Sequence, residues 1–121
     1  MEYKTEINRL ADEFESCRKI LVAFGDENRQ HMIIEMLNIN RCQGVRVGEI
    51  TEKTNLSRPA VSHHIRILKD AGIIKMRREG TRNYYYFDMD TEAMNKLLNM
   101  LEHAKSIMEG LPDRSGGEQQ A

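Results

Sequence analysis

The side chains best suited to chemistry gather in one short segment, where Ser62, His63 and Arg66 recur at helical spacing. At about 100° per residue they lie on one side of a helix, together with Pro59. The opposite side carries Val61, Ile65 and Leu68. A hydroxyl, an imidazole and a guanidinium can each donate a hydrogen bond to a phosphate or to a base edge in the major groove of DNA. We therefore expect this side to contact DNA; the alternative is the solvated face of a structural helix.

The start of this helix supports the same expectation. Ser57 is a residue type favoured as an N-cap, and Pro59 falls in the first turn, where its missing N–H has no helical partner to lose. Arg58 lies in that turn, at the helix end that already attracts anions. His64 falls nearer the apolar side, so we expect it to be partly buried and hydrogen-bonded within the domain.

A second cationic group surrounds Gly80, which supplies a turn between two segments rich in β-favouring residues. Its neighbours are Arg77, Arg78, Thr81, Arg82 and Asn83. Three guanidinium groups on such a loop suit the minor groove or adjacent phosphates, where positive charge is attracted without much reading of sequence. A hairpin that is merely soluble would mix charges of both signs, whereas only Glu79 opposes the cations here.

Hydrophobic periodicity predicts the elements that must hold these groups. In chain order we expect helices at 4–24, 26–37, 47–54 and 57–71, strands at 73–78 and 82–88, and a last helix at 91–109. The order α-α-α-α-β-β-α, mainly helical with a small β-hairpin, is typical of a winged helix-turn-helix. We expect one domain over 1–110, followed by a disordered polar tail over 111–121.

Composition and charge are compatible with a small DNA-binding protein. The 121 residues are 40% hydrophobic and 31% charged, which allows one ordinary globular domain. Residues 41–82 carry ten Lys or Arg and four Asp or Glu, whereas the remainder carries eight and fifteen. A basic middle between acidic flanks is typical of a phosphate-facing segment. We see neither a membrane-spanning stretch nor a secretory signal and expect a cytoplasmic protein with no membrane partner.

Two other classes of function fit less well. An enzyme is not expected, because no Gly-rich phosphate loop, nucleophile elbow or HExxH motif is present. The adjacent His63 and His64 point to different sides of one helix and lack a pocket-forming context. The alternative that stays open is a winged helix that docks a protein partner through its basic face, although docking faces usually carry exposed aliphatic or aromatic anchors.

Two segments resemble a known family. They are AFGDENRQHMIIEML and VGEITEKTNLSRPAVSHHIRILKDAGIIKMRREGTRNYYY, and they resemble the ArsR/SmtB family of bacterial winged helix-turn-helix transcriptional repressors. The resemblance covers about residues 14–108, and its specific parts are Gly25-Asp26 with Arg29, the run from Leu56 to His64, and the Arg-Glu-Gly turn followed by tyrosines. One departure is Glu27-Asn28, where the family usually has Pro-Thr.

The resemblance implies a homodimeric repressor that binds an inverted-repeat operator and is released by an effector. It implies that the positions facing DNA are Ser57, Arg58, Pro59, Ser62, His63 and Arg66. The dimer would form through the first and last helices, whose apolar positions include Ile7, Leu10, Phe14, Leu97, Leu101 and Met108.

The resemblance leaves the effector open. Many relatives bind metal through a Cys-x-Cys in the third helix, but Arg46 and Gly48 stand at the matching positions and cannot be ligands. Others hold zinc, nickel or cobalt between the two last helices, where the matching residues here are Asp90, Glu92, His103 and Ser106. Such a set would bind a divalent metal weakly, and no other cofactor is expected. Alternatively, Asp90 and Glu92 simply suit the helix dipole, with His103 on the surface.

The two cysteines offer a redox route, because some relatives sense oxidants or sulfur species through a thiol pair. Cys17 lies on the apolar stripe of the first helix, which favours a small buried hydrophobe. Cys42 lies in a polar loop beside Arg41, which favours the thiolate, although an ordinary exposed thiol is the alternative. Whether the two can pair stays open. Ligandless family members also exist, so repression without an effector stays open too.

Overall fold

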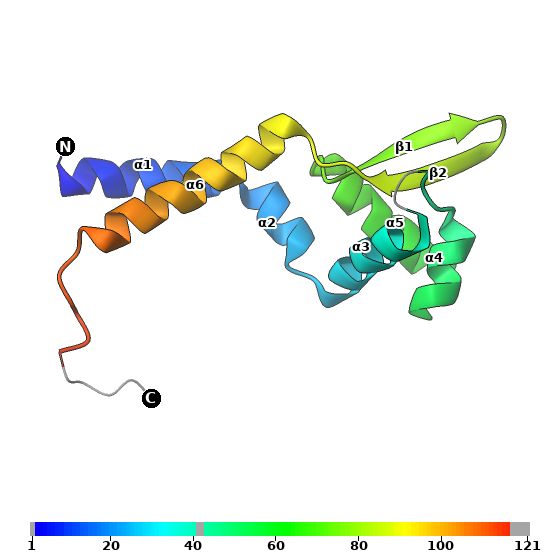
Figure 1. Ribbon diagram of the computed structural model, residues 1–121, viewed down its shortest axis with the longest axis horizontal. Helices are drawn as coiled ribbons and strands as arrows, with labels where there is room; N and C mark the ends of the chain where they lie inside the picture. Colours follow the sequence, from blue (N-terminus) through cyan, green and yellow to red (C-terminus); the bar gives the residue numbers. More distant parts are fainter. Residues whose placement is uncertain (1, 41–42, 117–121) are drawn as a thin grey trace.

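The molecule has two parts, an arm and a head (Figure 1). The computed structural model describes residues 2–40 and 43–116. Its elements are α1 (Tyr3–Ser16), α2 (Arg18–Phe24), α3 (Glu27–Asn40), α4 (Val47–Thr54), α5 (Arg58–Asp70), β1 (Ile74–Glu79), β2 (Arg82–Phe87) and α6 (Thr91–Glu109). Helices α1 and α6 lie side by side and form the arm, whereas α2 to α5 and the β1–β2 hairpin form the head.

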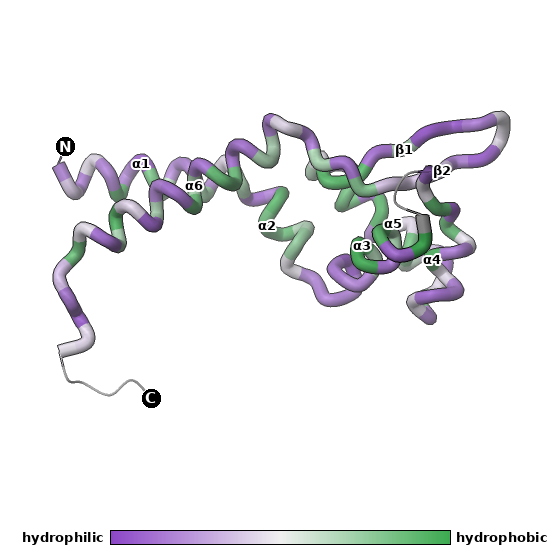
Figure 2. The backbone as a smooth tube through the Cα atoms, viewed as in Figure 1, coloured by the Kyte–Doolittle hydropathy of each residue, from purple (hydrophilic) through white to green (hydrophobic). Residues whose placement is uncertain are grey.

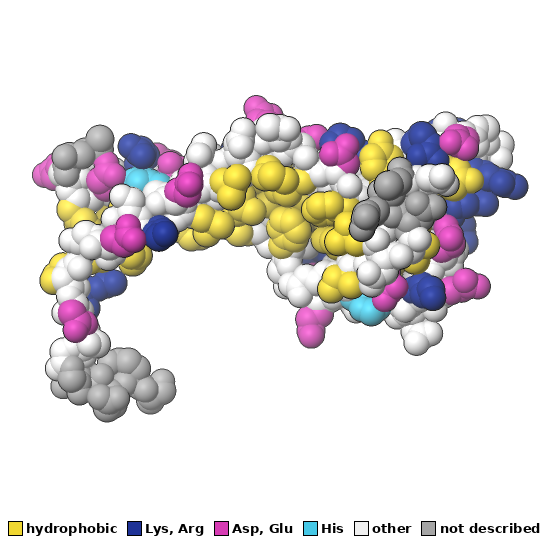
Figure 3. Space-filling view, viewed as in Figure 1, with side chains coloured by type: hydrophobic (Ala, Val, Ile, Leu, Met, Phe, Trp, Pro, Cys, Tyr) yellow, Lys and Arg dark blue, Asp and Glu magenta, His cyan; other side chains and the backbone are white. Residues whose placement is uncertain are grey.

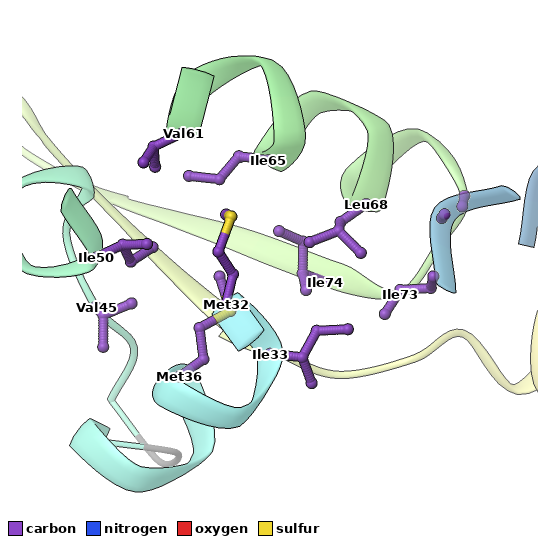
Figure 4. Packing of buried hydrophobic residues seen from close by; sticks show 12 residues of the cluster. Met32, Ile33, Met36, Val45, Ile50, Val61, Ile65, Leu68, Ile73 and Ile74 are labelled. Carbon is purple, nitrogen blue, oxygen red and sulfur yellow. The ribbon is translucent and has the colours of Figure 1, made fainter. Parts of the chain in front are cut away.

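The head is built around one apolar core (Figure 4). Helix α3 and helix α5 face each other across it through Met32, Ile33, Met36, Val61, Ile65 and Leu68. Ile50 of α4 and Ile74 of β1 also pack into this core. Burying an aliphatic side chain of this size contributes about 1.5–3 kcal/mol. Helix α5 is therefore fixed with its apolar side inward and its polar side toward solvent.

The hairpin is anchored at its base and projects at its tip. Strands β1 and β2 pair antiparallel from Ile74 opposite Phe87 to Glu79 opposite Arg82. The two-residue turn that joins them contains Gly80 with φ +64°, a conformation that glycine adopts readily. Within β2, the backbone groups of Tyr85 exchange two hydrogen bonds of 2.8 Å with those of Val45, from the loop before α4.

The arm has a smaller apolar cluster of its own. Leu10 and Cys17 pack with Met100 and Ile107 of α6. Figure 2 shows hydrophobic residues alternating with hydrophilic ones along both helices, as expected for amphipathic helices. Across residues 2–40 and 43–116, no helix combines the length and the apolar composition that crossing a bilayer requires.

The order of elements agrees with the prediction, apart from a division of the first helix. The second helix differs in its length, and α5 and the two strands differ from their expected bounds by one residue. The helix expected over 4–24 is divided at Cys17, because α1 packs along α6 while α2 packs against α3 and α5. The second helix continues beyond its expected end, to Asn40. Helices α4 and α6 have the predicted bounds. Residues 111–116 of the expected tail form neither helix nor strand, and 117–121 lie outside the described residues.

Candidate nucleic-acid interface

Helix α5 presents the polar side expected of it. Ser57 caps the helix, with its Oγ accepting a hydrogen bond from the backbone N–H of Ala60 at 3.2 Å. Val61, Ile65 and Leu68 are buried. The side chains expected to face DNA are all exposed; they are Ser57, Arg58, Pro59, Ser62, His63 and Arg66. These polar groups therefore share one solvent-facing side of a helix whose other side is held in the core.

The turn between α4 and α5 sets the direction of this helix. Asn55 adopts a left-handed conformation with φ 59°, which asparagine tolerates better than most residues. The hydroxyl of Thr54 donates to the carbonyl of Ile50 at 2.8 Å and accepts from the backbone N–H of Leu56 at 3.4 Å. The chain thus reverses within a few residues and enters α5, as the sequence predicts for a helix-turn-helix.

The arginines of the hairpin are not equivalent. Arg78 and Arg82 are exposed near the tip, where Nε of Arg78 donates to the carbonyl of Gly80 at 2.9 Å. Figure 3 shows Lys and Arg side chains gathered at this end of the molecule. Arg77 instead donates from Nε to Glu79 and from Nη1 to the carbonyl of Gln43, each at 2.8 Å. Its guanidinium also lies 4.9 Å from the ring centre of Tyr84, its cross-strand neighbour. Arg77, which we expected to face DNA, is therefore engaged within the protein.

A cleft of about 500 Å³ lies between the start of α5 and the hairpin. Its walls include Arg46, Gly48, Glu49, Glu52, Arg58, Thr81 and Asn83. Glu49 is engaged at the start of α4, where its carboxylate accepts the backbone N–H of Arg46 at 2.9 Å. The guanidinium groups of Arg46 and Arg58 can contact a phosphate backbone, whereas the carboxylates in the same cleft repel it. Arg46 is not among the residues that the sequence predicts to face DNA; the available signal was its place in the basic 41–82 segment.

His64 lies apart from the exposed side of α5, as predicted. It is half-buried, and its Nδ1 lies 3.0 Å from Nη1 of Arg29. Burial is the main cause that lowers the pKa of His64; the positive charges of Arg29 and His63 lower it further, and Asp26 opposes them. The expectation of a partly buried histidine with a partner inside the domain is confirmed.

Comparison with known proteins places this geometry in a family. Residues 30–76 match the profile of bacterial regulatory proteins of the arsR family. The chain is also 42% identical over 77 residues to an uncharacterized HTH-type transcriptional regulator of Methanocaldococcus jannaschii, covering 62% of this chain and 81% of that relative. The chain belongs to the ArsR family.

Further relatives of this ArsR-family chain agree with that assignment. It is 28% identical over 82 residues to the transcriptional repressor SdpR of Bacillus subtilis, which spans 68% of this chain and 84% of SdpR. An ArsR-like transcriptional regulator from Rhodococcus sp. RHA1 shares the fold, with a TM-score of 0.68 at 18% identity over 82% of this chain and 85% of that structure. These relatives and neighbours are transcriptional regulators, not enzymes.

The residues at the expected metal-ligand positions of this ArsR-family chain differ in their surroundings. Asp90 precedes α6 and lies 3.0 Å from Nζ of Lys75, and Glu92 lies in the first helical turn. His103 is not a surface residue, because only 8% of it is exposed. Its Nδ1 faces Glu13 at 2.6 Å and its Nε2 faces Glu6 at 2.8 Å. A metal that binds His103 would first have to displace one of these carboxylates.

Of the two cysteines of the ArsR-family chain, Cys17 lies among the described residues. Cys17 is 1% exposed and packs in the apolar cluster of the arm, as its place on the hydrophobic stripe predicts. Cys42 lies outside the described residues. Burial shields the Cys17 thiol from dissolved oxidants, because reactivity requires access as well as thiolate character.

Some of the residues expected at a dimer interface are covered within the arm of this ArsR-family chain, and others are exposed on it. Leu10, Ile7 and Leu97 pack between α1 and α6 of the same chain, and their expected place at a dimer interface stays a prediction. Periodicity shows that a stripe is apolar but not which helix covers it. Exposed apolar side chains remain on α1, α2 and α6 (Figure 3); they include Phe14, Val22, Met94, Leu98, Leu101 and Met108. We refer to these six residues, five on the arm and Val22 on the adjoining α2, as the apolar arm face.

Proposed function

We propose that the chain is a sequence-specific transcriptional repressor that binds an inverted-repeat operator as a homodimer and releases it when an effector binds. The observation that carries the proposal is the exposed, donor-bearing side of α5 beside a cationic hairpin. Ser62, His63 and Arg66 would contact base edges and phosphates in the major groove. Arg78 and Arg82 would contact phosphates beside the minor groove. Membership of a family of regulators supports this function. A relative named as a repressor supports repression rather than activation of transcription.

The apolar arm face supports the homodimer. Leu101 is 52% exposed and Val22 is 57% exposed, and water contact with clustered apolar side chains of this size is unfavourable. A two-fold axis at this face would bring two arms together and carry two heads. Each head would then present one α5, and the two would read half-sites about 34–36 Å apart, one turn of DNA.

The experiment that tests this function measures binding to the DNA upstream of the chain's own gene by fluorescence anisotropy at several salt concentrations. We expect tighter binding to this DNA than to an unrelated duplex, and an affinity that falls steeply as salt rises. Arg66→Ala should weaken specific binding, whereas Arg114→Ala, which removes the same charge from an exposed site after α6, should not. Equal binding to both duplexes, or an affinity indifferent to salt, would overturn the proposal.

The effector is tested on the same protein–DNA complex with zinc, an oxidant and a persulfide donor. Release by zinc that Asp90→Ala abolishes would assign sensing to the start of α6. Release by the oxidant or the persulfide that Cys42→Ser abolishes would assign it to a thiol. A complex that none of the three releases would contradict both routes and favour repression controlled in another way.

A further inference from the structure

Arg29 closes the end of α2 from a buried position. The residue is 7% exposed, and its guanidinium donates from Nε to the carbonyl of Ala23 at 2.8 Å and from Nη2 to the carbonyl of Val22 at 2.9 Å. Carbonyls in the last turn of a helix lack partners within the helix. Its backbone N–H donates to Oδ1 of Asp26 at 3.1 Å. Arg29 is thus fixed to the junction between α2 and α3.

The remaining nitrogen of the same guanidinium, Nη1, reaches α5. Nη1 of Arg29 lies 3.0 Å from Nδ1 of His64. Arginine stays protonated in proteins and has only donors, so Nδ1 of His64 has to accept. The imidazole must then be neutral with its proton on Nε2. A protonated His64 would turn a donor and a positive charge toward the guanidinium.

The contact connects the arm to the polar side of α5. Helix α2 continues from α1 after a break at Cys17 alone, and α1 packs along α6. His64 lies next to His63 of the exposed side, with 5.7 Å between the two ring centres. A displacement of the arm therefore reaches α5 through a buried side chain that spans the α2 end and the helix itself.

We propose that Arg29 and His64 form a positioning pair that sets the orientation of α5 relative to the arm, and that the pair holds only while His64 is neutral. The inference rests on the proposed function, because two copies of α5 must meet two half-sites together. His64 acts here through Arg29 and not by touching DNA. Val61, Ile65 and Leu68 keep α5 in the core without the pair, so its loss changes the orientation of the helix rather than the fold.

The change of operator affinity at low pH should distinguish the effect of His64 from that of the other histidines. The titratable groups that face His64 are Asp26, Arg29 and His63. Added positive charge on the exposed side of α5 would strengthen its attraction to phosphate. His103 keeps its two carboxylate contacts when charged. Neither effect weakens binding to DNA, so a loss of operator affinity in acid points to His64.

The test compares three variants of the full chain for operator affinity between about pH 5 and pH 8, with unrelated DNA and thermal unfolding measured alongside. His64→Ala removes the acceptor, and we expect its operator affinity at every pH to lie on the order of ten-fold below that of the wild type with neutral His64. His64→Gln keeps a side-chain carbonyl that can accept from Arg29 but does not titrate, so it should restore affinity and remove the acid loss. His31→Gln removes an exposed histidine from α3 and should behave as the wild type does.

The outcomes separate this inference from the proposed function. Wild-type protein that binds no upstream DNA specifically would overturn the proposed function and the positioning role together. Specific wild-type binding with unchanged affinity in His64→Ala, or an acid loss that persists in His64→Gln, would overturn the positioning role alone. A His64→Ala protein that unfolds early is judged by His64→Gln, whose restored affinity without acid loss supports the pair.

Discussion

Nδ1 of His103 in α6 lies 2.6 Å from Oε1 of Glu13 in α1, so one side-chain contact ties the two helices of the arm together. The other ring nitrogen lies 2.8 Å from Oε1 of Glu6. Ionised carboxylates only accept hydrogen bonds, and imidazole has two N–H donors only when it is protonated. The contacts with Glu13 and then Glu6 raise the pKa of His103, against the opposing effects of burial and of the charge on Arg9.

We expect the chain to lose stability as the pH rises above 6.5, through the raised pKa of His103. The folded pKa of His103 lies above its usual 6.5, so its stabilisation is complete below pH 6.5 and is lost as the pH rises through the raised pKa. The hydrogen bond from His103 is the main cause that lowers the pKa of Glu6, so this contribution is present above pH 4.5 while His103 is protonated and is lost as the pH falls through the lowered pKa. Thermal unfolding at a series of pH values measures both effects.

His103→Gln should remove the loss of stability that accompanies rising pH above 6.5, because glutamine does not titrate. His31→Gln is the matched control, since His31 pairs with Glu35 on the surface of α3 at 3.7 Å. If the unfolding midpoint declines with rising pH as much in His103→Gln as in the wild type, the assignment to His103 is refuted.

Two serines of α5 should separate stability from binding. Ser57 caps the helix through Ala60, so Ser57→Ala should lower the free energy of unfolding by about 1 kcal/mol. Ser62 is exposed on the polar side, and Ser62→Ala should leave stability within about 0.5 kcal/mol of the wild type while weakening operator binding. Urea unfolding and anisotropy on the same samples measure the two quantities. Equal losses of stability in both variants would show that the two serines have the same role.

The sequence predicts the polar side of α5 well because a single periodicity determines it. Ser62, His63 and Arg66 lie opposite the buried positions of one helix, and no other element is needed to place them. The bounds of α4 and α6 follow equally from local signals. Local patterns are therefore sufficient where one helix decides the outcome.

Contacts between distant segments are what the sequence cannot predict. The partners of His103 lie about ninety positions away in α1, and nothing in the local pattern pairs a helix end with a helix start. Arg77 belongs to the same cationic run as Arg78, but its guanidinium reaches the carbonyl of Gln43 in a preceding loop. The division of the arm between a covered side and the apolar arm face is likewise decided by packing.

The hairpin arginines should differ in their effect on the salt dependence of binding. Arg82 is exposed, and Arg82→Gln should reduce the slope of log affinity against log salt by about 1 for each lost phosphate contact, or about 2 for a dimer. Arg77→Gln removes internal hydrogen bonds instead. It should leave the slope nearly unchanged and lower stability by about 0.5–1.5 kcal/mol. The reverse pattern in salt titrations would show that Arg77 is the phosphate contact.

Leu101 should be necessary for the dimer and dispensable for the fold of one chain. Its side chain is 52% exposed on α6, so Leu101→Glu adds a charge that one chain can keep in water but that a buried interface cannot accept without a large desolvation penalty. We expect sedimentation to show a monomer, and operator affinity to fall about 100-fold or more because the second half-site no longer binds within the same complex. Leu37→Glu is the matched control, because Leu37 is 41% exposed on α3, outside the arm, and this variant should stay dimeric. A dimer that survives Leu101→Glu but separates in Leu37→Glu would place the interface on the head and not on the apolar arm face.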